Sequence, residues 1–181
     1  MLIFLYGQDD YRRREKEKFY LDEFKKKYSH LGIGKFDLSG DGEFEKFQEF
    51  VRSQSIFEPA KLVFVEGCGE LEEGAEKKFV GELKPLAEAQ QTTIILSFAK
   101  KPPAAYGALM KKAFKAEEFG ALSGYEWEKF VRSEAKKYNV PLADDAVRFL
   151  ADAYQGDSWR LVTELQKLSN LLLIIETDKY R

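Results

Sequence analysis

A turn near the N-terminus stands where a phosphate-binding loop would occur in a nucleotide-hydrolysing protein. A phosphate loop has the pattern GxxxxGK(S/T), in which backbone N–H groups and a lysine surround the phosphates at the start of a helix. The corresponding turn here reads Gly7-Gln8-Asp9-Asp10, with no second glycine and no lysine beside a serine or threonine. Its two aspartates would place negative charge where a phosphate would bind. We therefore expect no ATP hydrolysis at this turn.

Histidine and cysteine, which serve in many catalytic and zinc sites, each occur once in the chain. One histidine, His30, argues against histidine-based catalysis or a histidine-ligated zinc. The lone cysteine, Cys68, lies between two glycines, and no adjacent basic residue would lower the pKa of its thiol. A single cysteine also excludes an internal disulfide and is typical of a reducing cytoplasm. We expect no catalytic residue, no metal site and no cofactor.

The charge balance narrows the class of partner. The 181 residues include 29 basic and 31 acidic side chains, a formal net charge of −2. This balance argues against a protein that binds polyanions over its whole surface, and leaves only local basic clusters as candidates for contact with a DNA backbone. The best candidate cluster consists of Lys100, Lys101, Lys111, Lys112 and Lys115.

Short apolar runs alternate with amphipathic segments over the first 120 residues. The runs at 2–6, 62–65 and 92–98 predict buried strands, and an alternating pattern at 35–38 predicts another. Helical spacing occurs between them, and a short helix is expected to end at about Lys115. Strands that alternate with helices predict an α/β fold with a mostly parallel sheet and helices on both faces.

The pattern changes near residue 120. Ser123 and Glu126 have the spacing of a capping box, which predicts that a helix starts there. From this point only helical spacing recurs, in three amphipathic segments. We therefore expect two domains: residues 1–120 with the α/β fold, and residues 121–181 as a small three-helix domain.

One loop contains an apolar pair that neither the helical nor the strand pattern explains. Ile56 and Phe57 follow Gln54 and Ser55 and precede the helix-incompatible Pro59. In one interpretation both side chains pack beneath the sheet as an extension of the core. In the other they project and enter a hydrophobic pocket of a partner protein. The pattern alone leaves both interpretations open.

The order of several short motifs resembles the delta subunit of the bacterial DNA polymerase III clamp loader. The first motifs are YGQDDY at 6–11 and SIF at 55–57, ahead of a strand that begins with a lysine. The later ones are Trp127, GD at 156–157 and ELQKL at 164–168. They occur in matching order along the whole chain, and their combination is more specific than any one of them.

The resemblance implies a RecA-like domain of the AAA+ class without a functional phosphate loop, followed by the small helical AAA+ lid domain. Members of the family have a third domain, a helical collar, which the resemblance implies is absent from these 181 residues. The chain would then be a non-catalytic component of a DNA-directed DNA polymerase holoenzyme.

The resemblance also implies a binding site. In the family, delta opens the ring-shaped sliding clamp by inserting a Ser-Leu-Phe plug into a hydrophobic pocket of the clamp. Ser55 matches the serine, Ile56 stands at the leucine position and Phe57 matches the phenylalanine. In the family a glutamine usually stands a few residues before the plug. Here Arg52 or Ser53 occupies that place and Gln54 is displaced by one or two positions, so the polar anchor of the plug departs from the pattern.

The expected partners follow from the same resemblance. They are the sliding clamp, the delta-prime and ATPase subunits of the loader, and primed DNA within the assembled complex. The isolated chain is expected to be a cytoplasmic monomer, without a secretory signal or a membrane span. Two other classes stay open: a nucleotide-binding protein with a degenerate phosphate loop, which ATP would stabilise, and a stand-alone DNA-binding α/β protein with salt-dependent affinity.

Overall fold

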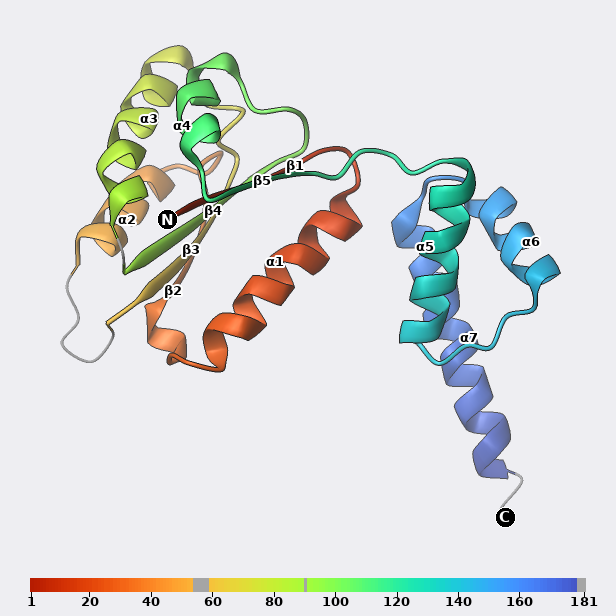
Figure 1. Ribbon diagram of the computed structural model, residues 1–181. Coiled ribbons are helices and arrows are strands. Elements are labelled where there is room, and N and C mark those ends of the chain that lie inside the picture. The colour runs from red at the N-terminus through yellow and green to blue at the C-terminus, as the bar shows by residue number, and fades with distance from the viewer. Residues whose placement is uncertain (54–58, 90, 179–181) are drawn as a thin grey trace. The chain divides into compact units, whose positions relative to one another are not determined.

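A computed structural model describes residues 1–53, 59–89 and 91–178 of the chain (Figure 1). The chain divides into two compact units, Met1–Phe119 and Gly120–Arg181. The first unit combines a parallel sheet with helices, and the second consists of helices. Among the described residues, no helix has both the length and the hydropathy that crossing a membrane requires.

The sheet of the first unit has five strands in the order β2-β3-β4-β1-β5, and every neighbouring pair is parallel. Its three inner strands are the continuous apolar runs of the sequence, as expected for strands that are covered on both faces. The strands are β1 Leu2–Tyr6, β2 Ile33–Asp37, β3 Lys61–Glu66, β4 Thr92–Phe98 and β5 Lys115–Glu118.

Helices cover both faces of this sheet. Helix α1 lies on one face, and α2, α3 and α4 lie on the other (Figure 1). Alternate residues of each inner strand serve the two faces: Ile3 packs in the cluster that includes side chains of α1, whereas Phe4 packs in the cluster that includes Phe47 and Phe79. The helices are α1 Asp10–Lys25, α2 Glu43–Arg52, α3 Glu73–Glu88 and α4 Gly107–Lys112, with short 3-10 turns at His30–Gly32 and Ala104–Tyr106.

The parallel register brings the ends of the strands together. The last residue of β1, Tyr6, is paired with Phe98 of β4 and with Glu118 of β5, and the last residues of β2 and β3 are paired with each other. The loops that follow these strands therefore leave the sheet at one edge, its carboxyl edge. The segments that precede the strands enter at the opposite, amino edge.

The second unit consists of α5 Gly124–Lys137, α6 Asp144–Tyr154 and α7 Ser158–Asp178. Apolar side chains at helical spacing meet in one core, which includes the fully buried Val131 and Leu161. The indole Nε1 of Trp127 donates to the carbonyl of Ala151 at 2.9 Å, which joins α5 to the last turn of α6. The helix start predicted at Ser123 is confirmed, although its side chain makes no capping hydrogen bond.

The prediction of a helix that continues to about Lys115 is wrong. Helix α4 ends at Lys112, and Lys115 is the first residue of the fifth strand, β5. This strand is short, largely exposed and charged, and among the strands that the structure describes it pairs with β1 alone. An edge strand of this kind has no apolar run and no alternating burial, so its sequence does not distinguish it from a loop or a frayed helix.

Candidate functional site

The turn between β1 and α1 is built by close contact with the end of the sheet. The N–H of Gly7 donates to the carbonyl of Phe98 at 3.0 Å, and Gly7 has a φ of +130°. A Cβ atom at this position would lie 2.3 Å from the carbonyl oxygen of Phe119. Only glycine fits here, and the chain turns directly from the sheet into the helix.

The carboxylates of Asp9 and Asp10 occupy the start of α1. Asp9 is 8% exposed and caps the helix by accepting a hydrogen bond from the N–H of Arg12 at 3.1 Å. The two oxygens of Asp10 accept from Arg13 Nη2 at 2.7 Å and from Arg14 Nε at 2.8 Å. The positive end of the helix dipole and two guanidinium groups are therefore already matched by carboxylates of the chain itself.

Arg13 links this turn to the sheet. Its side chain is buried, and Nη1 donates to the Oγ of Ser97 on β4 at 2.6 Å. Glu17, one turn further along α1, has a raised pKa mainly because it is buried; hydrogen bonding from Ser97 and the charges of Arg13 and Arg14 oppose the shift. The result is a partly buried network of acids and guanidinium groups, which holds α1 against the sheet.

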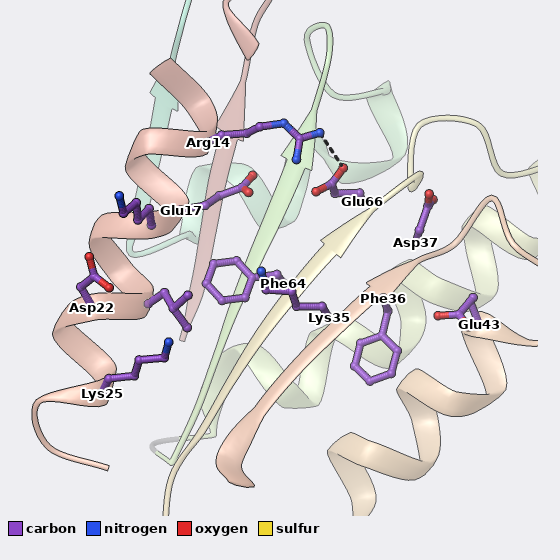
Figure 2. A pocket seen from close by; sticks show the side chains of 12 residues that line it. Arg14, Glu17, Asp22, Lys25, Lys35, Phe36, Asp37, Glu43, Phe64 and Glu66 are labelled. Atoms are coloured by element: carbon purple, nitrogen blue, oxygen red, sulfur yellow. Dashed lines mark ion pairs between the residues drawn. The ribbon is translucent and has the colours of Figure 1, made fainter. Parts of the chain in front are cut away.

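A groove of about 750 Å³ lies beside this network, between α1 and the strands β2 and β3 (Figure 2). Arg14 reaches across its upper end towards Glu66 of β3, with 3.8 Å between Nη2 and Oε2. Phe64 lies on its floor, where the Nζ of Lys35 is 5.6 Å from the centre of the ring. Acidic and basic side chains alternate around the groove, so its charge does not select a phosphate or any other ligand of one sign.

A second cavity, of about 430 Å³, lies at the carboxyl edge of the sheet and includes Lys100 and Lys101. Asp37, Glu66 and Glu70 line it as well. Hydrogen bonds from the side chain and backbone of Ser39 lower the pKa of Asp37, so this carboxyl group favours its charged form. The two lysines are thus balanced by acids across the cavity.

The five lysines of the predicted basic cluster do not form one patch. All five are exposed. Lys100 and Lys101 follow the end of β4 at the carboxyl edge, whereas Lys115 opens β5 at the amino edge and forms an ion pair with Glu117 at 2.7 Å. The reason is that α4, which ends with Lys111 and Lys112, returns the chain from the carboxyl edge to the amino edge between them.

Residues 54–58, which include the predicted plug residues Gln54, Ser55, Ile56 and Phe57, lie outside the described part of the chain. Both flanks of this segment are described. On one side α2 ends at Arg52, and on the other side β3 begins at Lys61. Because β3 begins at the amino edge of the sheet, both flanks lie away from the turn at Gly7.

Side chains of α2 fix the first flank to its neighbour α3. Arg52 Nη2 forms an ion pair with Glu82 Oε1 at 2.7 Å, and Gln48 Nε2 donates to the same oxygen at 2.9 Å. The second flank reaches back to the first, because the ammonium group of Lys61 donates to the Oγ of Ser53 at 3.0 Å. The two ends of the segment are therefore connected to each other and to the rest of the unit.

The single cysteine lies in the core of the first unit. Cys68 is fully buried, and burial raises the pKa of its thiol. The described residues contain no group of three or more histidine, cysteine or acidic side chains placed to hold a metal ion.

Sequence reasoning missed two sets of contacts around these sites. The pairing of Asp10 with Arg13 and Arg14 has i,i+3 and i,i+4 spacing, which is a readable signal on a predicted helix. The contact between Lys61 and Ser53 crosses a loop, and no spacing rule applies to it.

Neither a protein-family model nor a curated protein matches the sequence. Solved structures do match. The Bacillus subtilis DNA clamp loader delta protein has 19% identity and a TM-score of 0.59, over 94% of this chain and 53% of that one. The Thermotoga maritima RuvB Holliday junction branch migration motor has 10% identity and a TM-score of 0.63, over 96% and 56%.

Domain III of the Thermotoga maritima replication initiation protein DnaA also matches, with 11% identity and a TM-score of 0.54, over 99% of this chain and 78% of that one. The chain therefore spans about half the length of the delta protein and of the RuvB motor. These likenesses confirm the predicted fold class and the resemblance to delta at the level of the fold. The chain shares the fold of these proteins: a unit with a parallel sheet and flanking helices, followed by a small helical unit.

Proposed function

We propose that the chain is part of a clamp-loader delta subunit, which binds the sliding clamp and helps to open its ring for loading onto primed DNA. The observation that carries the proposal is the sequence Ser55-Ile56-Phe57 between α2 and β3 of a RecA-like AAA+ fold. The match of this fold to the clamp loader delta protein supports it, as does the order of the shared motifs.

The plug can supply the energy that a clamp contact requires. Burying an isoleucine or phenylalanine side chain in a partner's pocket contributes roughly 1.5–3 kcal/mol each. Such a contact opens a ring only if it binds the open interface more tightly than the closed one. Ile56 and Phe57 would therefore act by differential affinity, and the chain would need no chemistry of its own.

The proposal includes a non-catalytic role. Asp9 and Asp10 take the place where a phosphate loop would bind a nucleotide, and their carboxylates are matched by the helix end and by Arg13 and Arg14. ATP energy would then come from other loader subunits. Lys100 and Lys101 are the exposed basic pair that we propose for contact with primed DNA in the assembled complex.

Mixing the tagged chain with the sliding clamp of the same organism, followed by a pull-down, tests the proposal. We expect the clamp to be retained by the parent chain and lost with the double variant Ile56→Ala, Phe57→Ala. Absence of the clamp from the parent pull-down would contradict the proposal. Tight, salt-dependent binding of duplex DNA by the chain alone would instead favour a DNA-binding protein.

A further inference from the structure

The end of α2 is held by a side chain from a different element. The last carbonyls of a helix have no partner within the helix. Here Lys61 Nζ donates to the carbonyls of Phe50 and Ser53 and to Ser53 Oγ at 3.0 Å, and it lies 3.4 Å from the carbonyl of Val51. Ser53 Oγ in turn donates to the carbonyl of Phe50 at 2.8 Å.

The position of this ammonium group is favourable although it is partly buried. The negative end of the helix dipole attracts a cation. The ring of Phe50 lies with its centre 5.1 Å from Nζ, within the range of a cation–π contact. Burial lowers the pKa of Lys61, so these contacts offset only part of the cost of removing the ammonium group from water.

The backbone of Lys61 is fixed in the sheet. The N–H of Lys61 donates to the carbonyl of Gln91 at 2.7 Å, and Lys61 is paired with Thr92 in the register of β3 and β4. The other end of the contact, α2, is fixed to α3 through Glu82. The Lys61 side chain thus connects two rigid elements on either side of the plug segment.

We propose that Lys61 is a positioning residue for clamp binding: by joining the end of α2 to the start of β3, it fixes both ends of the segment that contains the plug. This inference rests on the proposed function. Holding the ends of a loop removes conformational freedom before the partner arrives, so less entropy is lost on binding. Without Lys61, Ser53 and the first residue of β3 would no longer be joined by this contact when the clamp arrives.

Measuring the association and dissociation rates of the chain with the sliding clamp tests this inference. Lys61→Met keeps an unbranched side chain as far as the ε position but removes the charge and the donors, and we expect a Kd about tenfold higher than that of the parent. The loss should fall mainly on the association rate, because the contact atoms of the plug are unchanged. Lys61→Arg keeps a cation in place, and it should restore most of the affinity.

Lys35→Met is the matched control, since it also removes an ammonium group that lies over a phenylalanine ring, on the α1 face of the sheet. We expect its Kd to equal that of the parent. Thermal melts show which variants are folded at the assay temperature. If Lys61→Met is not folded at that temperature, Ser53→Ala is measured in its place, and we expect its Kd to be about threefold higher than that of the parent.

The outcomes separate the two proposals. Failure of the parent chain to bind the clamp contradicts the proposed function itself. If the parent binds and a folded Lys61→Met has the same Kd and the same rates, the role of Lys61 is contradicted, whereas the proposed function is not. The same holds for Ser53→Ala where Lys61→Met does not fold.

Discussion

The ammonium group of Lys61 and the hydroxyl group of Ser53 lie 3.0 Å apart, across the only break in the described chain between α2 and β3. The first residue beyond a helix is thereby joined to the first residue of a strand. Because β3 is an inner strand of the sheet, the contact attaches the end of α2 to a strand that has neighbours on both sides. A segment that must present two apolar side chains to a partner benefits from ends of this kind.

The tight turn after β1 predicts a severe effect of adding one methyl group. In Gly7→Ala the new Cβ would meet the Phe119 carbonyl at 2.3 Å while φ stays at +130°. We expect the free energy of unfolding to fall by about 3 kcal/mol or more, measured by urea denaturation.

Gly81→Ala is the control for this substitution. Gly81 lies inside α3, and a Cβ there would meet nothing within 4 Å. We expect it to raise the free energy of unfolding by up to about 1 kcal/mol. Equal stability of Gly7→Ala and the parent would contradict the described turn.

The partly buried position of Glu17 predicts a pH-dependent stability. Burial raises its pKa above the ordinary 4.5, so the folded chain binds this proton more tightly than the unfolded chain. The free energy of unfolding therefore decreases as the pH rises from about 4.5 through the raised pKa. Glu17→Gln removes this loss, so its Tm should exceed that of the parent at pH 7, with a smaller difference at pH 4.

The exposed Glu45 of α2 supplies the control, since Glu45→Gln makes the same chemical change away from this network. If Glu17→Gln instead lowered the Tm at pH 7, the charge pairing of Glu17 with Arg13 and Arg14 would outweigh its burial, contrary to the prediction.

The arrangement of Asp9 and Asp10 predicts that nucleotides do not stabilise the chain. A ligand that binds the folded state raises the Tm with increasing concentration. We expect millimolar Mg-ATP to leave the Tm unchanged and the purified chain to release no phosphate. A Tm that rises with ATP concentration would favour the nucleotide-binding alternative.

The elements that the sequence predicts well are those whose burial fixes their composition. Strands β1, β3 and β4 are buried on both faces and read as apolar runs, whereas the edge strand β5 is charged and was missed. The predicted strand at 35–38 overlaps β2, Ile33–Asp37, but begins two residues later. The start of β2 was missed because Gly34 has no side chain to continue the alternation.

The candidate sites depend more strongly on tertiary structure. Lys101 and Lys111 are close in sequence, but Lys101 follows β4 at the carboxyl edge, whereas Lys111 lies near the end of α4, which leads to the amino edge. No local sequence pattern indicates this separation. The start of α5 could be read, because the spacing of Ser123 and Glu126 is a local signal for the beginning of a helix. The contact between Lys61 and Ser53 could not, because it depends on where β3 enters the sheet.

A titration of the sliding clamp with Phe57→Ala tests the central claim most directly. Phe114→Ala is the matched control, since Phe114 is 70% exposed and lies outside the plug segment. Removing an anchor that fills a partner's pocket typically costs about 2 kcal/mol, so we predict a Kd roughly 30-fold higher for Phe57→Ala, with an unchanged free energy of unfolding and no change in Kd for Phe114→Ala. An unchanged Kd, together with a free energy of unfolding lower by about 2–5 kcal/mol, would mean that Phe57 is a core residue and would contradict the account.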